Sequence, residues 1–250
     1  MVCGSVSYAT DQGRRHYQED RFFFQAVPSS RPTGWLMAVM DGHGGSETAG
    51  FCAEEIHGLF SSCVRRSSPE LTLRALVAGL NEKTRHLDDG TTLSIAWVRE
   101  NRDEVTVAVL GDSPVLVMSR SGKMRLSPEH NVRTNLAERH AAITRGGSYN
   151  GSYICNRHGD GLQISRALGD RDLDPILSRE PEVYTVKKPR WVIVGTDGML
   201  DPGHGNTTAL VRELPSVMKP KVGASGLMSW AKSRGLHDNA TVLMWESGKR

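Results

Sequence analysis

The chain reads WLMAVM from Trp35 to Met40 and continues as Asp41-Gly42-His43-Gly44-Gly45, and this segment decides the fold. A short apolar run of this kind predicts a buried strand, which the following Asp-Gly pair ends. The two further glycines allow a tight turn into a helix. The strand therefore delivers an acidic side chain, Asp41, to the point where the chain leaves the sheet.

Three other aspartates occupy comparable positions. Asp112 follows VTVAVLG, Asp197 follows WVIVGT, and Asp238 precedes a strand expected near Thr241. Any one of them alone is explained as a turn residue, because Asp-Gly is a common turn pair. Carboxylates at strand ends are costly to bury without a partner, so the four together favour a shared cation.

The residue types narrow the choice of cation. Oxygen ligands without a cluster of Cys or His indicate a hard ion, Mg²⁺ or Mn²⁺, rather than structural zinc. Two such ions about 4 Å apart polarise a phosphoryl oxygen and supply hydroxide at neutral pH. The pattern therefore predicts hydrolysis of phosphate esters with water as the nucleophile.

The rest of the chain supplies both helices and strands. Apolar residues at helical spacing predict helices near residues 46–60, 69–87, 133–145 and 222–234. Strands are expected at 21–27, 34–40, 191–194 and 241–245, and period-two alternation from 91 to 120 predicts an antiparallel meander. Hairpin-linked strands with helices between them predict an α+β fold, with antiparallel sheets packed together and helices outside.

Composition argues against several classes of protein. The 250 residues include 31 Lys and Arg against 28 Asp and Glu, so the net charge of +3 does not indicate nucleic-acid binding. The apolar runs are far shorter than the roughly 20 residues that cross a bilayer, so no membrane span is expected. No linker or repeat divides residues 1–250, which predicts a single domain.

The cysteines and the first residues bear on location. The four cysteines form neither a CxxC pair nor a dense framework, so free thiols in a reducing compartment are expected. The N-terminal stretch lacks the apolar segment of a secretory leader. Both features favour a cytoplasmic location and leave the mitochondrial matrix and the nucleus open.

Seven short motifs, in order along the chain, resemble the metal-dependent serine/threonine protein phosphatases of the PP2C (PPM) family. They are Arg15-x-x-x-Glu19-Asp20, Asp41-Gly42-His43-Gly44-Gly45, Gly90-Thr91-Thr92, Gly111-Asp112-Ser113, Ser165-Arg166-Ala167-Leu168-Gly169-Asp170, Thr196-Asp197-Gly198-Met199-Leu200-Asp201 and Asp238-Asn239-Ala240-Thr241-Val242. The resemblance covers essentially the whole chain. It implies an αββα sandwich, two packed antiparallel β-sheets flanked by helices, and an enzyme that hydrolyses phosphoserine and phosphothreonine in proteins.

The resemblance also implies a centre of two Mg²⁺ or Mn²⁺ ions, with a weaker third. Asp41 would bridge the two ions, and the Gly42 carbonyl would add an oxygen to one of them. The other positions implied are Glu19 and Asp20 for metal-bound waters, Asp197 and Asp238 for the second ion, and Asp112 and Asp201 for the third. Retained waters oriented by neighbouring acids agree with the coordination habits of these metals.

Two basic residues complete the implied machinery with Asp41. Arg15 matches the family's phosphate-binding arginine, and a planar guanidinium engages two phosphoryl oxygens at once. His43 stands next to the ligands, where it would donate a proton to the departing serine or threonine oxygen. Arg166 and Asp170 are interpreted as a buried pair that supports the site, with Asp170 as a direct metal ligand the less favoured alternative.

One departure from the family pattern keeps alternatives open. Pro114 follows Gly-Asp-Ser where the family usually has Arg, which removes a charge and fixes a backbone angle near Asp112. An active phosphatase with phosphoprotein substrates, monomeric and without nucleic-acid or membrane partners, is the main hypothesis. The alternatives are a catalytically silent or weak domain that binds and regulates a phosphoprotein, and a hydrolase of small phosphate esters.

Overall fold

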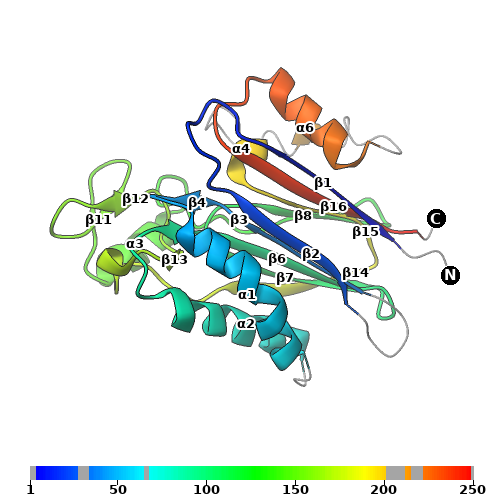
Figure 1. Ribbon diagram of the computed structural model, residues 1–250, viewed down its shortest axis with the longest axis horizontal. Helices are drawn as coiled ribbons and strands as arrows, with labels where there is room; N and C mark the ends of the chain where they lie inside the picture. Colours follow the sequence, from blue (N-terminus) through cyan, green and yellow to red (C-terminus); the bar gives the residue numbers. More distant parts are fainter. Residues whose placement is uncertain (1–3, 28–33, 65–67, 201–211, 215–221, 249–250) are drawn as a thin grey trace.

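The computed structural model describes residues 4–27, 34–64, 68–200, 212–214 and 222–248. Two five-stranded antiparallel sheets form its centre (Figure 1). The first sheet has the order β1-β16-β15-β8-β9, with bounds Ser5–Asp11, Ala240–Glu246, Pro189–Gly195, Val115–Ser119 and Met124–Leu126. The second has the order β14-β7-β6-β3-β2, with bounds Glu182–Lys187, Glu104–Leu110, Leu93–Arg99, Gly34–Met40 and Arg21–Val27.

The inner faces of the two sheets pack against each other. β3 and β7 contribute Val39 and Val107 from the second sheet, while β8 and β15 contribute Val117 and Val194 from the first, and all four are fully buried. Branched side chains on a pleated surface interdigitate well. This layer explains why β7 is buried along its whole length, since α2 covers its outer face.

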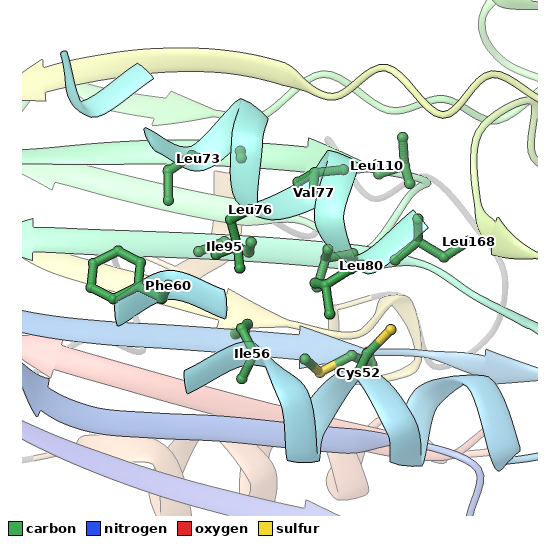
Figure 2. Packing of buried hydrophobic residues seen from close by; sticks show 14 of the residues in the cluster. Cys52, Ile56, Phe60, Leu73, Leu76, Val77, Leu80, Ile95, Leu110 and Leu168 are labelled. Atoms are coloured by element: carbon green, nitrogen blue, oxygen red, sulfur yellow. The ribbon is translucent and has the colours of Figure 1, made fainter. Parts of the chain in front are cut away.

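Two helices cover the outer face of the second sheet. α1, Glu47–Cys63, and α2, Pro69–Thr84, lie side by side on the strands (Figure 1). Figure 2 shows Ile56 and Phe60 of α1 and Leu76 and Leu80 of α2 directed toward Ile95 of β6. α2 begins as its sequence predicts, because Ser68 accepts the backbone N–H of Leu71 at 3.3 Å.

The first sheet is covered in the same way. α6, Gly223–Ser233, packs on β1 and β16, and the short α4, Asp197–Leu200, packs on β16. The predicted αββα sandwich is therefore confirmed, with one helical layer on each outer face (Figure 1). Within the described part of the chain, no helix has the length and apolar character needed to traverse a membrane.

The expected meander between residues 91 and 120 is wrong in its third strand. β6 and β7 pair as predicted, but β8 pairs with β15 and β9 in the other sheet. The chain changes sheets at Gly111, whose φ of 107° places it in the left-handed region. The backbone N–H of Val115 then donates to Ser127 Oγ at 2.9 Å, and the turn delivers β8 to the opposite layer.

Other elements differ in extent from the expectation. The helix expected from 133 to 145 is α3, Leu136–Thr144, because Asn135 caps it by accepting the N–H of Glu138. α2 ends before Leu87. The edge strands β1 and β14 were not expected, since their residues are mostly polar or half-buried. They form because each completes an antiparallel ladder with a buried neighbour.

Short elements gather beyond one end of the sandwich. β4, Gly42–His43, β5, Gly90–Thr91, and β13, Leu168–Gly169, form a three-stranded sheet with β5 in the middle. Next to it in Figure 1 lie α3 and a second small sheet of β10, Ser148–Tyr149, β11, Ile154–Cys155, and β12, Gly161–Leu162. A 3₁₀ turn, η1, spans Arg171–Leu173. These pieces surround the predicted site residues.

Candidate active site

Asp41 lies where β3 ends and β4 begins. Its backbone N–H donates to Thr92 Oγ1 at 3.1 Å, and its carbonyl oxygen accepts the backbone N–H of Thr92 at 3.0 Å. Thr92 Oγ1 lies 2.7 Å from Ser113 Oγ. These bonds hold Asp41 against the turn that carries Asp112.

The predicted carboxylates converge on Asp41. Burial raises the pKa of Asp41 well above its usual range, and the negative charges of neighbouring carboxylates raise it further. In order of effect, these neighbours are Asp20, Asp197, Asp112 and Asp238. Strand ends from both sheets therefore bring five carboxylates into electrostatic contact. We call these five residues the aspartate cluster.

Asp20 is the most enclosed member of the aspartate cluster, with 4% of its surface exposed. Burial raises its pKa to about 6, and the nearby charge of Asp238 acts in the same direction. Thr196 donates its hydroxyl to Asp20 Oδ2 at 3.0 Å. The other oxygen, Oδ1, is buried without a hydrogen-bond partner among the described residues.

Two glycines let the segments of the site approach closely. A Cβ on Gly42 would lie 2.6 Å from the carbonyl oxygen of Glu19, and a Cβ on Gly198 would lie 2.2 Å from that of Asn239. Both distances are too short for a real contact, so only glycine fits at either position. Gly42 thus lets the backbone of Glu19 pass close to β4. Gly198 lets the segment after Asp197 pass close to the start of β16.

Asn239 holds the N-terminal part of the site in place, a role that sequence reasoning missed. Its side-chain NH₂ donates to the carbonyl oxygens of Gln12 and Tyr17, each at 2.9 Å. Its side-chain oxygen accepts the backbone N–H of Glu19 at 2.8 Å. The sequence did offer one indication of this role: Asn239 lies in the motif next to Asp238, and an amide side chain can both donate and accept hydrogen bonds.

Arg15 lies at the exposed edge of the aspartate cluster. Its guanidinium donates to Asp238 Oδ2 at 2.6 Å, and 54% of its side chain is exposed. The guanidinium therefore stands beside the carboxylates with donors facing solvent. This placement suits recognition of a phosphate that approaches the cluster.

His43 contacts a residue that the sequence analysis paired differently. Its Nε2 lies 2.9 Å from both carboxylate oxygens of Asp170. The predicted pair between Arg166 and Asp170 is therefore wrong, because Asp170 faces β4 across β5. Arg166 instead donates to Glu138 of α3, with Nη2 2.5 Å from Oε1 and Nε 3.0 Å from Oε2.

Glu138 lies at the centre of a second buried group of charges. Burial alone would raise the pKa of Glu138, but hydrogen bonds from Arg166 and Ser165 lower it below its usual range. His130 is fully buried nearby, and burial lowers its pKa to about 4, with the Arg166 charge acting in the same direction. We call Ser165, Arg166, Glu138 and His130 the glutamate cluster.

His130 received no role from the sequence, yet it supports the turn before Asp112. Its Nδ1 accepts the backbone N–H of Gly111 at 3.1 Å, and the backbone N–H of His130 donates to the Gly111 carbonyl oxygen at the same distance. The buried imidazole must be neutral to accept at Nδ1. No spacing in the sequence shows this contact.

Pro114 leaves the surroundings of Asp112 ordered. Asn131 donates its side-chain NH₂ to Asp112 Oδ2 at 2.9 Å. The Pro114 carbonyl oxygen accepts the N–H of Gly195 at 3.1 Å, which ties this turn to the end of β15. Asp201, predicted with Asp112 for a third metal, lies outside the described residues.

The aspartate cluster fits a hard divalent cation. Its donors are oxygens, and one oxygen of Asp20 has no hydrogen-bond partner among the described residues. Burial and then mutual repulsion raise the pKa of both Asp20 and Asp41. A bound cation would remove that repulsion. His130, Glu138 and Glu182 also bring ligand atoms within 4.8 Å of one another, but there the Arg166 guanidinium already supplies the positive charge.

Comparison with known proteins assigns the fold to a family. A protein kinase and PP2C-like domain-containing protein of Arabidopsis thaliana is 28% identical over 263 residues, which cover 98% of this chain and 39% of that protein. A solved sex-determining protein of C. elegans has a TM-score of 0.80 at 25% identity, covering 98% of this chain and 65% of the other. Serine-threonine phosphatase 2C from Toxoplasma gondii has a TM-score of 0.75 at 20% identity, covering 98% and 95%.

The chain thus spans less than two thirds of the length of the first two of these proteins. The family model described as protein phosphatase 2C matches residues 5–240, nearly the entire chain. This protein therefore belongs to the protein phosphatase 2C family.

Proposed function

We propose that this chain hydrolyses phosphoserine and phosphothreonine esters of proteins at a centre of two Mg²⁺ or Mn²⁺ ions. The observation that supports the proposal best is the aspartate cluster, where burial and, to a smaller extent, repulsion raise the pKa of Asp41 and Asp20 and no buried cation of the chain compensates among the described residues. Membership of the family supports the same reaction.

The metal-holding residues are those that the family resemblance implies, and the gathering of five aspartates supports them. Asp41 and the Gly42 carbonyl, with Asp197 and Asp238, would hold the two ions, while Glu19 and Asp20 would orient their waters. Asp112 and Asp201 are proposed for a weaker third ion. When bound, such ions polarise phosphoryl oxygens and lower the pKa of water, which then serves as the nucleophile at neutral pH.

The remaining residues handle the substrate. Arg15 would bind two phosphoryl oxygens through its solvent-facing donors. The water oxygen forms a bond to phosphorus, the ester P–O bond breaks, and its electron pair leaves with the serine or threonine oxygen. His43 would give that oxygen a proton, because an alkoxide is a poor leaving group. Asp41 remains a ligand throughout.

The test is release of phosphate from a phosphothreonine peptide with Mn²⁺, with Mg²⁺ and with EDTA. Asp197→Ala should lose turnover by at least about 10²-fold, since it removes a ligand needed for metal chemistry. Asp172→Ala is the matched control, because this aspartate is 70% exposed on η1 and pairs only with Arg171 among the described residues. Near-ultraviolet circular dichroism verifies that each variant is folded.

Other outcomes identify the alternatives. Folded protein that binds Mn²⁺ by calorimetry but releases no phosphate would support a silent domain that binds a phosphoprotein. Pro114 would then be the first residue to exchange, for the arginine usual in the family. Equal kcat/KM for the peptide and a small aryl phosphate would instead support a hydrolase of small esters.

A further inference from the structure

The small sheet β4-β5-β13 brings two side chains together over a glycine. His43 is directly opposite Gly90 in the β4–β5 ladder, and Gly169 is opposite Gly90 on the other side. Asp170 follows immediately after β13. The ladder therefore places His43 and Asp170 on either side of the same residue of β5.

Gly90 makes this contact possible. A Cβ at Gly90 would lie 2.1 Å from Asp170 Oδ2 and 2.4 Å from His43 Nε2. No side chain of any kind fits there, so the space above Gly90 belongs to the two polar groups. In it, His43 Nε2 lies 2.9 Å from both carboxylate oxygens of Asp170.

The backbone of Asp170 is held in an unusual conformation to reach this position. Its φ of 49° and ψ of 56° are left-handed, which is costly for a residue with a Cβ. Its N–H donates to the carbonyl oxygen of Asp89 at 3.0 Å, and the largely buried Arg179 donates to the Ala167 carbonyl oxygen at 2.5 Å. The surrounding bonds thus hold the carboxylate toward His43.

Asp89 links the same sheet to the helix that follows His43. Its carboxylate accepts the N–H of Glu47 at 2.6 Å and the hydroxyl of Thr48 at 2.6 Å, at the start of α1. The segment from His43 into α1 and the segment carrying Asp170 are therefore fixed to one residue pair, Asp89-Gly90. This leaves the His43 ring and the Asp170 carboxylate little freedom to move apart.

We propose that Asp170 is a positioning residue for His43, which fixes the imidazole so that Nε2 carries a hydrogen and Nδ1 is the atom presented to substrate. An ionised carboxylate only accepts, so a ring nitrogen bound to both of its oxygens must be the N–H nitrogen. This inference rests on the proposed function for the identity of the reaction that uses Nδ1. There, the imidazolium form of His43, with a hydrogen on each nitrogen, gives its Nδ1 proton to the ester oxygen as the P–O bond breaks. Nδ1 keeps the electron pair, and the neutral ring that remains has its hydrogen on Nε2, against Asp170.

The tautomer is measured first, because it needs no turnover. In a long-range ¹H–¹⁵N spectrum of protein labelled on its nine histidines, the His43 signals are those absent from His43→Gln. The wild type should show a hydrogen on Nε2. Asp170→Ala should give a mixture of tautomers, and so should Asp170→Asn, because its amide can accept from Nε2–H or donate to a bare Nε2. A bare Nε2 in the wild type, or an unchanged spectrum in Asp170→Ala, would overturn the proposal.

Kinetics then tests whether the contact matters for the reaction. Asp170→Ala should lower kcat on a phosphothreonine peptide by at least about 10-fold with KM nearly unchanged, while an aryl phosphate, whose leaving group needs no proton, keeps about its full rate. His43→Ala with Asp170→Ala should be no slower than His43→Ala alone, since Asp170 acts through His43. Asp170→Asn should also lower kcat on the peptide, because its amide no longer requires the hydrogen to be on Nε2, and Asp172→Asn should change neither substrate.

The two hypotheses fail in different ways. Equal losses on both substrates, or additive losses in the double variant, would show that Asp170 supports the fold rather than His43. If the wild type has no phosphatase activity, the proposed function fails while the spectra still decide the position of the hydrogen. Asn also adopts left-handed backbone readily, so Asp170→Asn separates loss of the contact from loss of folding.

Discussion

The aspartate cluster and the glutamate cluster both contain a buried acid, Asp20 and Glu138 respectively, and their electrostatics are opposite. In the glutamate cluster, Arg166 and Ser165 hold Glu138 ionised and lower its pKa. In the aspartate cluster, burial and mutual repulsion raise the pKa of Asp41 and Asp20. The glutamate cluster brings its own cation, and the aspartate cluster has only Arg15 at its exposed edge among the described residues. Several acids held close together with one exposed cation beside them, among the described residues, favour a cationic ligand from outside the chain.

The strongest contrast should come from removing Arg166. Arg166→Met leaves Glu138 buried without a cation and should destabilise the protein by about 3–5 kcal/mol, measured by urea unfolding. The double variant with Glu138→Gln should regain much of this loss, because an uncharged pair needs no cation. A loss below about 1 kcal/mol for the single variant would show that solvent satisfies Glu138.

The next largest effect should be the contribution of His130 to the pH dependence of stability. The fold holds His130 neutral and lowers its pKa from 6.5 to about 4. Between these two pH values, His130 therefore binds a proton more readily in the unfolded chain than in the folded protein. Stability is fully present above pH 6.5 and is lost as the pH falls toward 4, in total on the order of 3 kcal/mol.

His130→Asn isolates this contribution. Asn places a carbonyl oxygen near the position of Nδ1, so it still accepts the N–H of Gly111 while adding no titrating group. The variant should be less stable at pH 7 and lose less on acidification to pH 5. Arg166, Glu138 and Glu182 face His130 in both proteins, so their titration largely cancels in the difference. Parallel pH profiles for the two proteins would contradict the prediction.

Removing a charge from the aspartate cluster should raise the stability of the protein, whereas removing Arg166 from the glutamate cluster should lower it. An acid whose pKa is raised by the fold opposes folding once the pH exceeds its unfolded value of 3.8. In EDTA at pH 7.5, Asp41→Asn should therefore stabilise the protein, seen as a higher Tm.

Added metal should make the wild type more stable than Asp41→Asn, the reverse of the order in EDTA. Mn²⁺ should raise the Tm of the wild type through preferential binding to the folded state, and raise that of Asp41→Asn far less. Asp172→Asn, on the exposed turn η1, should behave as the wild type in both buffers. An Asp41→Asn protein that is less stable than the wild type in EDTA would show that repulsion does not govern the cluster.

The sequence predicted the sandwich and the gathering of the aspartates because both depend on local patterns. A buried strand that ends in Asp-Gly is visible in the chain, and the order of the motifs supplied the rest. The edge strands β1 and β14 were missed, since half-exposed strands need not alternate between apolar and polar residues. The change of sheet at Gly111 was missed because strand pairing is a property of the whole fold.

The partners of charged side chains were the least predictable part. Arg166 and Asp170 stand four residues apart in one motif, and proximity suggested a pair. The structure separates them, because β13 directs Asp170 over Gly90 toward His43 while Arg166 reaches Glu138 of α3. Neither partner is near in sequence, so no spacing rule finds them.

The smallest effect should come from Ser165, the neutral donor of the glutamate cluster. Its hydroxyl lies 2.5 Å from Glu138 Oε2 and 3.2 Å from the His130 carbonyl oxygen. Ser165→Ala should cost about 1–2 kcal/mol in urea unfolding, since one hydrogen bond to a charged acceptor is lost while the Arg166 guanidinium remains. A loss as large as that of Arg166→Met would mean that Glu138 depends on the hydroxyl as much as on the cation. A smaller loss locates the difference between the two clusters in the largely enclosed guanidinium of Arg166, since the guanidinium beside the aspartates, that of Arg15, is exposed.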